Sequence, residues 1–229
     1  MSTIVITGAS SGLGAAMARA LDADGHAVHN YDIATNPTHD VRDFAAANRF
    51  FAQVDGKCDV LINNAGINGL DWLADLEGDK WDSIMDTNAK GIYTMTRAAL
   101  PYLRASGGTI INVVSNAAHI PMRASLAYNA SKGAAHIMTL QLARELAPEI
   151  TVLGIAPNRL AATGMTDLID TECGRVRGWS REQAIQYEQK SALVPERTPP
   201  EAIAGLVQYL LRSKDNHKYL SGCILPYGA

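Results

Sequence analysis

Short, continuous runs of aliphatic and β-branched residues recur along the chain, and longer stretches with apolar positions every three or four residues separate them. Continuous runs are typical of strands buried on both faces of a parallel sheet, and the longer spacing is typical of amphipathic helices. The predicted strands are residues 4–6, 27–31, 60–62, 109–114, 150–156 and 223–225. The predicted helices are residues 12–23, 42–54, 79–104, 126–146, 181–190 and 200–211. This alternation predicts an α/β fold over residues 1–229: one doubly wound, Rossmann-type parallel sheet with helices on both faces.

The connection after the second predicted strand is short. Asp32 ends that strand, and if Asp40 and Val41 lie in the third, residues 33–39 alone join the two. A parallel crossover normally needs a dozen or more residues, usually with a helix. Asn36-Pro37 is a turn signal. We therefore expect the second crossover to be shortened to a loop, and a two-turn helix within residues 33–39 would contradict this.

Length and composition are those of a globular domain. The chain has 229 residues, of which 47% are hydrophobic and 19% charged, as is ordinary for a soluble protein with one sizeable core. The net charge is −3, and both signs are scattered along the chain. No basic patch of the kind that binds nucleic acid is present in the sequence, so we expect no nucleic-acid partner.

The cysteines and the first residues favour the cytoplasm. The three cysteines are far apart, odd in number and without the spacing of metal ligands, which fits free thiols in a reducing compartment. The first predicted strand begins almost at once, without the charged and apolar segments of a signal peptide, and no apolar run is long enough to cross a bilayer. The sequence predicts a cytoplasmic protein with no membrane contact and no metal site.

A glycine-rich loop joins the first predicted strand to the first predicted helix, with the spacing Gly-x-x-x-Gly-x-Gly. Glycines let the backbone turn tightly and approach a pyrophosphate, and the N–H groups of the following helix receive the anion. The spacing differs from G-x-G-x-x-G, and no Gly-Lys-Ser/Thr follows, which excludes a P-loop. A glycine turn without a ligand is the alternative. The candidate cofactor-binding residues of this loop are Gly8, Ser10, Ser11, Gly12, Leu13 and Gly14.

Asp32 lies 18 residues after Gly14, at the predicted carboxyl end of the second strand. An acid at this place hydrogen-bonds a ribose diol and repels a 2′-phosphate. Neither Ser11 nor Ile33 supplies the cation that an NADP site needs, so the sequence favours NAD(H) over NADP(H). Asp40 is a candidate for the adenine edge. The alternative for Asp32 is an ordinary carboxylate at a strand end.

Tyr128 and Lys132 stand four residues apart on a predicted helix, and Ser115 lies 13 residues before the tyrosine. Side chains at i and i+4 share one face of a helix. An ammonium beside a phenol favours the phenolate and so lowers the pKa of the tyrosine. That shift would make Tyr128 a usable proton donor or acceptor near neutral pH. The same spacing also occurs on solvated helix faces.

Together and in this order, the motifs resemble the classical short-chain dehydrogenase/reductase (SDR) family, and the resemblance covers nearly the whole chain. It rests on Thr7-Gly8-x-x-x-Gly12-x-Gly14, Asp40-Val41, Asn63-Asn64-Ala65-Gly66, Asn88, Ser115 and Tyr128-x-x-x-Lys132. Two later segments match further landmarks of the family, Arg197-Thr198-Pro199-Pro200-Glu201 and Tyr219-Leu220-Ser221-Gly222. The missing second crossover helix looks more like the subgroup that contains 3α-hydroxysteroid dehydrogenase and dihydropteridine reductase.

The resemblance implies nicotinamide-dependent interconversion of an alcohol and a carbonyl compound. Because Asp32 favours NAD(H), we expect NAD(H)-dependent interconversion of a secondary alcohol and a ketone. As NADH delivers hydride to the carbonyl carbon, Tyr128 would donate a proton to the oxygen and Ser115 would hydrogen-bond and orient it. Lys132 would lower the tyrosine pKa and hold the nicotinamide ribose. Asn88 would anchor a water chain that returns the proton to solvent. In oxidation the roles reverse, with the tyrosinate as base.

The resemblance also extends the predicted cofactor site and implies subunit contacts. The additional cofactor-binding residues are Asp40, Val41, Asn64, Ala65, Gly66, Tyr128 and Lys132. Members of the family are commonly homo-oligomers, so we expect a tetramer or dimer that packs through residues 79–104 and 126–146. The substrate would be a small alcohol or carbonyl compound.

Two positions depart from the family pattern. The glycine that follows the proline after the sixth family strand is Asn158 here. Asparagine tolerates a left-handed backbone better than most residues, so the turn is expected to survive, with a side chain near nicotinamide or substrate. The terminal Val-Asp-Gly-Gly of the family is Pro226-Tyr227-Gly228-Ala229. That end often contributes to subunit contacts, so the change weakens the inference of an oligomer.

Residues 158–195 are the predicted substrate lid. Within them, Arg175 and Arg177 suggest attraction of an anionic substrate, although a solvated loop face is the more common role of such charges. The segment between Ser115 and Tyr128 offers His119, Met122 and Arg123 as pocket-wall candidates.

Two other functions remain open. A nucleotide-sensing protein without turnover has no need of a complete catalytic set, so the presence of all four residues argues against it. An NADPH-dependent pteridine or quinone reductase is suggested by the shortened crossover, and Asp32 argues against it.

Overall fold

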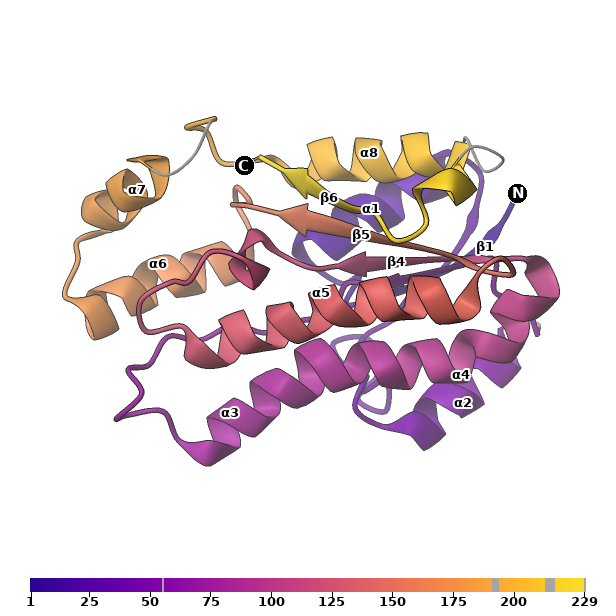
Figure 1. The fold of residues 1–229 in the computed structure, drawn as a ribbon, viewed down its shortest axis with the longest axis horizontal. Coiled ribbons are helices and arrows are strands. Elements are labelled where there is room, and N and C mark those ends of the chain that lie inside the picture. The colour runs from indigo at the N-terminus through magenta and orange to yellow at the C-terminus, as the bar shows by residue number, and fades with distance from the viewer. Residues whose placement is uncertain (55, 191–193, 213–216, 229) are drawn as a thin grey trace.

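The protein is described here from a computed structural model that covers residues 1–54, 56–190, 194–212 and 217–228. Its centre is a six-stranded sheet in the order β2-β1-β3-β4-β5-β6, in which every neighbouring pair is parallel (Figure 1). The strands are β1 (Thr3–Thr7), β2 (Ala27–Tyr31), β3 (Val60–Asn63), β4 (Thr109–Val113), β5 (Thr151–Pro157) and β6 (Ile224–Tyr227). The predicted doubly wound parallel sheet is confirmed.

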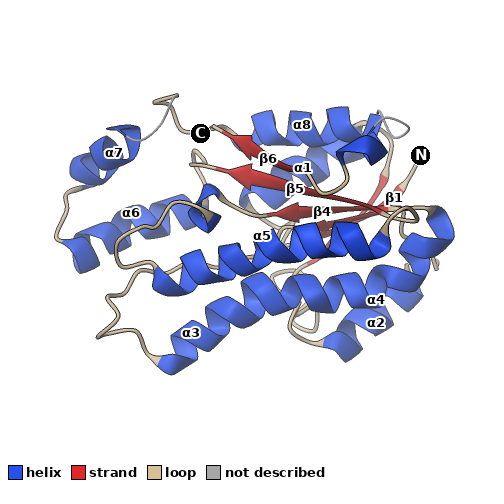
Figure 2. Ribbon diagram, viewed as in Figure 1, coloured by secondary structure: helices blue, strands red, loops and turns tan. Residues whose placement is uncertain are grey.

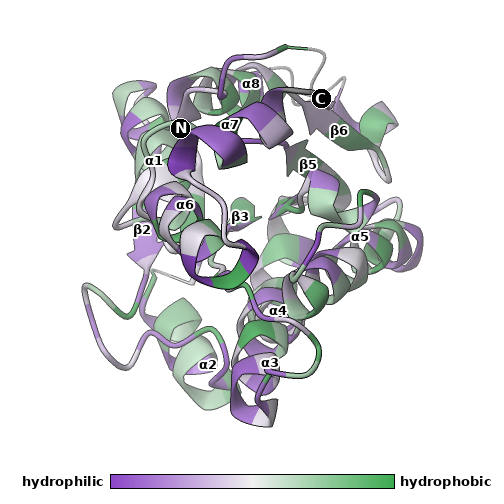
Figure 3. Ribbon diagram, turned by 90° about the vertical axis from the view of Figure 1, so that its left-hand side faces the viewer, coloured by the Kyte–Doolittle hydropathy of each residue, from purple (hydrophilic) through white to green (hydrophobic). Residues whose placement is uncertain are grey.

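Helices cover both faces of the sheet. Their bounds are α1 (Gly12–Ala23), α2 (Phe44–Gln53), α3 (Gly78–Met85), α4 (Gly91–Ser106), α5 (Leu126–Leu146), α6 (Gly164–Arg177), α7 (Arg181–Lys190) and α8 (Pro200–Arg212). Helices α1 and α8 pack on one face, and α2, α4 and α5 pack on the other (Figure 3). Each face has its own buried apolar cluster, because the central strands are buried on both sides.

The predicted helix over residues 79–104 is one long helical run with a change of pitch inside it. A π-helical turn at Asp86–Lys90 joins α3 to α4. Gly91, at the start of α4, lies against Val41, since a Cβ on this glycine would stand 2.9 Å from Cγ2 of the valine. π-Helical turns occur frequently at functional sites, and this one carries Asn88.

Helix α6 is absent from the sequence prediction. Its sequence mixes glycine, threonine, aspartate and cysteine, which are poor helix formers, and its buried residues are Asp170 and Cys173 rather than a row of aliphatic side chains. The capping residues at the two ends of α6 mark the helix in the sequence instead. The Thr163 side chain caps the first turn by accepting a hydrogen bond from the Thr166 N–H at 3.1 Å, and Gly178 ends the helix in a left-handed conformation.

The connection that leaves β2 is partly as predicted. Residues 33–39 form turns and no helix. The assignment of Asp40 and Val41 to a strand is wrong, because the backbone turns there: the Asp43 N–H donates to the Asp40 carbonyl at 3.0 Å. Asp43 then caps α2 by accepting from the Ala46 N–H at 3.0 Å. The crossover from β2 to β3 thus consists of the predicted loop followed by α2.

Helices α6 and α7 stand beyond the carboxyl ends of the strands, where Figure 2 shows them apart from the layered body. They occupy much of the predicted lid, of which residues 191–193 lie outside the described residues, as does Ala229. Among the described residues, no helix has the length and apolar character to span a bilayer. The same part of the chain holds no group of three or more histidine, cysteine or acidic side chains suited to a metal ion.

Candidate active site

A cavity of about 660 Å³ opens at the carboxyl ends of the strands. One end is lined by the glycine loop and Asp32, and the other by Ser115, Tyr128 and residues of α6. In parallel α/β sheets, ligands bind at this edge, where neighbouring crossovers diverge to opposite faces. The cavity joins the predicted cofactor residues to the predicted catalytic residues in one continuous space.

The glycine loop needs its glycines. Gly8 has φ +68°, and a Cβ on it would stand 2.9 Å from Cα of Ala65. A Cβ on Gly14 would stand 2.2 Å from the Gly8 carbonyl oxygen and 2.6 Å from Nδ2 of Asn64. Gly12, with φ +53°, also adopts a conformation that side chains disfavour. The loop therefore brings bare backbone to the cavity edge.

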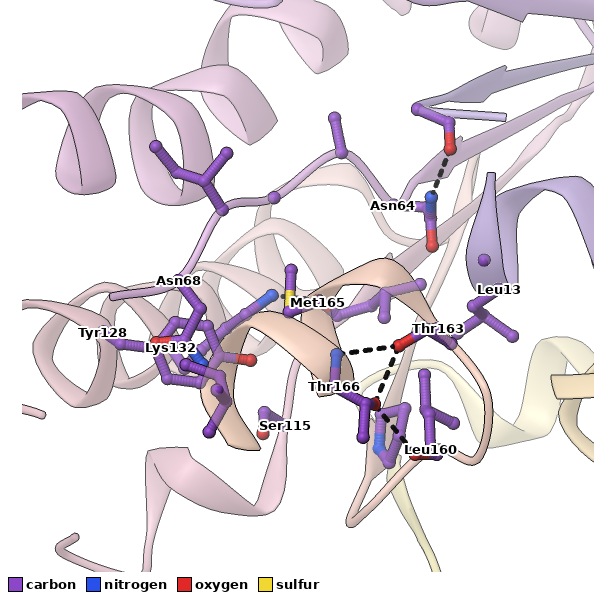
Figure 4. A pocket seen from close by; sticks show the side chains of 18 of the residues that line it. Leu13, Asn64, Asn68, Ser115, Tyr128, Lys132, Leu160, Thr163, Met165 and Thr166 are labelled. Carbon is purple, nitrogen blue, oxygen red and sulfur yellow. Dashed lines mark hydrogen bonds between the residues drawn. The ribbon is translucent and has the colours of Figure 1, made fainter. Parts of the chain in front are cut away.

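The amino end of α1 is open toward this cavity. Ser11 occupies the N-cap position, but its side chain makes no capping hydrogen bond, and Gly12 and Leu13 line the cavity. Free N–H groups at a helix start attract an anion such as a pyrophosphate. Asn64 braces the loop, since its Nδ2 donates to the carbonyls of Thr7 at 2.9 Å and Gly8 at 3.1 Å (Figure 4).

Asp32 lies at the cavity edge, directly after β2. Its carboxylate accepts hydrogen bonds from the N–H groups of Ser10 and Ala34, each at 2.9 Å. Burial alone would raise the pKa of Asp32, but these hydrogen bonds hold it below its ordinary value. A carboxylate offers about four acceptor sites, so an ionised Asp32 keeps capacity for a ribose diol. The glycine loop, the open helix end and this acid fit a nicotinamide dinucleotide.

Asp40 has a partner that the sequence reasoning missed. Arg42 donates two hydrogen bonds to the Asp40 carboxylate, from Nε to Oδ1 at 2.9 Å and from Nη2 to Oδ2 at 2.6 Å. This pairing holds the pKa of Asp40 below its ordinary value. Asp40, Val41 and Arg42 all line the same end of the cavity as Asp32. The sequence analysis found no cation near Asp32, but Arg42 lies at the same end of the cavity. Its guanidinium is already paired with the Asp40 carboxylate. The sequence signal for this ion pair is an acid and a base two residues apart, next to a predicted turn.

Ser115, Tyr128 and Lys132 are brought together at the other end of the cavity (Figure 4). Ser115 follows β4, while Tyr128 and Lys132 lie on one face of α5 near its amino end. All three are buried. Lys132 Nζ donates to the carbonyl of Val113 at 2.9 Å and lies 5.8 Å from the centroid of the Tyr128 ring. Strand β4 and helix α5 together fix the mutual geometry of these groups.

The expected lowering of the Tyr128 pKa by Lys132 is not found. Burial raises the pKa of Tyr128, and a hydrogen bond with Ser115 lowers it to a smaller extent. Burial also lowers the pKa of Lys132 to about 8, because desolvation penalises the ammonium. Removal from water outweighs the attraction between the two groups in this structure.

Asn88 differs from the other three candidate catalytic residues, because it does not line the cavity. Its side chain donates to the Ile67 carbonyl at 2.9 Å and to Ser131 Oγ at 3.0 Å, and it accepts from the Ile67 N–H at 2.8 Å. Ser131 Oγ in turn donates to the Tyr128 carbonyl at 2.8 Å. Asn88 thus connects the loop after β3 to the helix that carries Tyr128. This geometry is that of a positioning residue.

Asn158 lines the cavity, as its position after β5 predicts. Its backbone is not left-handed; among the described non-glycine residues, positive φ occurs at Ala124 and Ala162. The expected preservation of a left-handed turn at residue 158 is therefore wrong. Instead, Asn158 Nδ2 donates to the Gly228 carbonyl at 2.8 Å and ties the end of β5 to the C-terminal segment.

The three candidate pocket-wall residues differ in whether their side chains line the cavity. Met122 lines the cavity. His119 instead packs edge-on against His136, with ring centroids 4.3 Å apart. The guanidinium of Arg123 lies 5.4 Å from the Trp72 ring centroid. The loop before α5 therefore presents one of the three side chains to the substrate space.

Several residues line the cavity that sequence reasoning did not single out, and two of the predicted cofactor-binding residues, Ser10 and Gly14, do not line it. The missed residues come from loops and from α6, where local sequence carries little signal. They include Asn68, Leu70, Asn116, Ile120, Leu160, Thr163, Thr166 and Asp170. Thr163 and Thr166 lie close together in Figure 4, with hydroxyl oxygens 2.8 Å apart.

Comparison with known proteins identifies the class. The family described as short chain dehydrogenase matches residues 34–173. A Streptomyces virginiae protein assigned to monensin polyketide synthesis as a ketoacyl reductase is 34% identical, over 90% of this chain and 88% of that protein. The solved structure of NAD+-bound xylitol dehydrogenase has the same fold, with a TM-score of 0.91 at 24% identity, covering 100% of this chain and 98% of that one. The chain belongs to the short-chain dehydrogenase/reductase family of oxidoreductases.

Two further relatives differ in the cofactor that their names give. NADP-dependent 3-hydroxy acid dehydrogenase YdfG of Salmonella typhi is 30% identical, with 84% of each chain covered. NAD-dependent glycerol dehydrogenase of Listeria innocua is 32% identical, over 90% of this chain and 85% of that protein. Both nicotinamide cofactors thus occur among relatives at similar identity.

Proposed function

We propose that the protein is an NAD(H)-dependent oxidoreductase that interconverts a secondary alcohol and a ketone. The observation that carries the proposal is the shared cavity: the glycine loop and Asp32 line one end, and Ser115, Tyr128 and Lys132 line the other. A bound nicotinamide supplies hydride transfer to or from the substrate carbon. The chain supplies position, hydrogen bonds and a proton.

In reduction, the substrate oxygen accepts hydrogen bonds from Ser115 Oγ and from the Tyr128 hydroxyl. Negative charge grows on this oxygen, and Tyr128 transfers its proton to it. Burial raises the pKa of Tyr128, so the hydroxyl holds its proton at neutral pH and is ready as the acid. In oxidation, the same hydroxyl must first lose its proton, so the alcohol-oxidising rate rises with pH.

Lys132 has a second proposed role beside the tyrosine. Its ammonium stabilises the phenolate that remains after proton transfer and would hold the ribose of a bound nicotinamide cofactor by a hydrogen bond. With its pKa lowered to about 8 by burial, Lys132 exchanges protons more readily than an exposed lysine. Asn88 holds the loop after β3 against α5 and keeps Tyr128 in register.

The preference for NAD(H) rests on Asp32. Its ionised carboxylate would repel a 2′-phosphate and accept the ribose hydroxyls. Arg42 supports the second candidate, an NADPH-dependent reductase, because it lines the same end of the cavity. Since both of its bonded nitrogens already hold Asp40, the pairing leaves less attraction for a phosphate. Separate measurement of NADH and NADPH affinities decides: tighter NADPH binding overturns the Asp32 argument.

A panel of secondary alcohols and ketones, followed by nicotinamide absorbance with each cofactor, tests the reaction. Oxidation of NADH by at least one ketone is expected. Binding of NADH without turnover of any compound, at any pH between 6 and 10, would favour the nucleotide-sensing alternative.

We also propose a cytoplasmic homo-oligomer that pairs through α4 and α5. Exposed apolar side chains gather on these two helices, at Tyr93, Ile137 and Leu140. Sedimentation of the full chain tests this: a monomer at micromolar concentration contradicts it.

A further inference from the structure

Arg177 is a cation in the substrate end of the cavity with no carboxylate partner among the described residues. It ends helix α6 and lines the same cavity as Tyr128. Asp170, an acid that also lines the cavity, is paired with Arg197. The Arg197 Nη1 donates to Oδ2 at 2.9 Å and Nη2 donates to Oδ1 at 2.7 Å. Partly buried cations are usually paired, because removal from water is unfavourable for charge. The position of Arg177 therefore calls for a functional reason.

The neighbouring arginine shows what a structural role looks like. Arg175 binds the carboxylate of Glu172 and the carbonyl of Leu70, and its Nη2 lies 3.3 Å from Oδ1 of Asp71. It does not line the cavity. Two residues further along the same helix, Arg177 faces the other way. The pair thus divides into an arginine that anchors α6 and an arginine that faces substrate space.

The guanidinium of Arg177 is held in place by neutral groups. Its Nε donates to the Arg123 carbonyl at 3.1 Å, and Nη2 donates to the same oxygen. Nη1 donates to Sγ of Cys173 at 3.5 Å, and the group lies 5.0 Å from the Trp179 ring centroid. These contacts orient the guanidinium plane without neutralising its charge. They also tie α6 to the loop that leads from Ser115 to Tyr128.

Two of the five N–H donors of this guanidinium have no partner among the described residues. A guanidinium has one N–H on Nε and two on each terminal nitrogen, and the three bonds above use one on each nitrogen. The remaining pair lies on the two terminal nitrogens, one N–H on Nη1 and one on Nη2. The terminal nitrogens of a guanidinium form a fork that matches the two oxygens of a carboxylate, and such a bond is stronger in a partly buried site than in water.

We propose that Arg177 binds the carboxylate of the substrate, so that the substrates are oxo acids and the corresponding hydroxy acids. This rests on the proposed function, because the substrate carbonyl must meet Ser115 and Tyr128 while its carboxylate meets Arg177. The carboxylate then orients the molecule along the cavity, and the charge adds binding energy that a neutral ketone lacks.

The test compares acids with their own methyl esters, in which the ketone is retained and the charge removed. The probes are 2-oxobutanoate, acetoacetate and 4-oxopentanoate, with the three esters, assayed with NADH on the full chain. For the best acid, kcat/KM is expected to exceed that of its ester at least tenfold. Arg177→Gln should lower the value for the acid at least tenfold and change that for the ester less than threefold. Arg177→Lys should recover part of the loss, since it restores charge without the fork.

Arg175→Gln is the matched control. It removes ion pairs of α6 outside the cavity, so it should change acid and ester by the same factor. An equal loss on acid and ester in Arg177→Gln, or esters used as well as acids by the wild type, would show that Arg177 merely fastens α6 to the loop and would overturn the proposal.

Calorimetric binding of the three acids and their esters to the NADH-bound chain separates this proposal from the proposed function. If an acid binds more tightly than its ester, and Arg177→Gln abolishes the difference without hydride transfer in any variant, the carboxylate site stands and the reaction fails. If ketones are reduced but acid and ester bind alike, the reaction stands and the carboxylate site fails.

Discussion

The two ends of the cavity are built by different means. The proposed cofactor end is built mainly from backbone, with glycines, a helix start and strand ends, and the side chains of Asp32 and of the Asp40–Arg42 pair stand at its edge. The substrate end consists of side chains from α6, α7 and the loop before α5. Backbone geometry follows local rules of glycine and strand spacing, whereas a side-chain wall depends on how distant segments pack. The same fold can therefore keep one cofactor site while the substrate site varies.

The largest expected effect is at the cofactor end, from Gly14→Ala. The new methyl group would overlap the Gly8 carbonyl and Asn64, and neither is free to move because they brace the loop. We expect a loss of about 3 kcal/mol or more in the free energy of unfolding and loss of NADH binding. Denaturant unfolding and NADH fluorescence titration measure both.

Gly205→Ala in α8 is the matched control for that substitution. A Cβ there meets nothing within 4 Å, so alanine should stabilise the helix by about 0.5–1 kcal/mol. Equal effects of the two substitutions would break the view that close backbone approach defines the cofactor end.

Lys132→Met probes the boundary between the two ends. The folded-state pKa of Lys132 is lowered from 10.5 to about 8, so between these values the unfolded chain binds the proton and the folded chain does not. The contribution of this group to stability is absent below the folded pKa and appears as pH rises toward the unfolded pKa, by up to about 3 kcal/mol. The stability difference between Lys132→Met and wild type, measured by urea unfolding from pH 7 to 10.5, should shift in favour of wild type with increasing pH. A difference independent of pH contradicts the lowered pKa.

Asp32→Ala sharpens the cofactor end further. Loss of the carboxylate should weaken NADH binding and strengthen NADPH binding, so that the ratio of the two dissociation constants changes at least tenfold. Arg42→Ala is the companion variant and should weaken NADPH more than NADH in the Asp32→Ala background. An unchanged ratio in Asp32→Ala would mean that this carboxylate serves the Ser10 turn alone.

The smallest expected loss of stability belongs to Asn158→Gly at the proposed substrate end. It removes the hydrogen bond to the Gly228 carbonyl and adds backbone freedom to the unfolded chain, for a loss of about 1–2 kcal/mol. NADH affinity should stay within threefold. A large loss of NADH binding would mean that this side chain belongs to the cofactor end instead.

The sequence predicted secondary structure best where residues within the segment itself determine the conformation. The bounds of α1 and α5 match the prediction. Helix α1 is marked within its own segment by the glycine loop before it and by apolar periodicity. Asp40 and Val41 were assigned to a strand on spacing, but a turn at Asp40 and packing of Val41 under Gly91 decide their conformation. Helix α6 was missed because its interior is rich in poor helix formers, so that its end caps mark it more clearly than its interior does.

Within the site, the same division holds. The glycine loop and the Tyr128–Lys132 pair have fixed spacing and could be found in the sequence. That Asn88 does not line the cavity depends on its bonds to Ile67 and Ser131. That Arg177 lines the cavity and Arg175 does not depends on helix orientation and on contacts more than 50 residues apart in the chain. Burial of Tyr128 and Lys132 likewise reverses the pKa shift expected from the pair alone.

The most direct test of the proposed chemistry is Tyr128→Phe. The variant removes one hydroxyl at the substrate end and leaves the cofactor end untouched, so NADH affinity and unfolding temperature should stay close to wild type. Ketone reduction, followed as NADH absorbance with the best substrate of the panel, should fall to less than about one hundredth, as expected when a general acid is lost. Retention of more than a few per cent of turnover with unchanged NADH binding would contradict the assignment of Tyr128 as the proton donor.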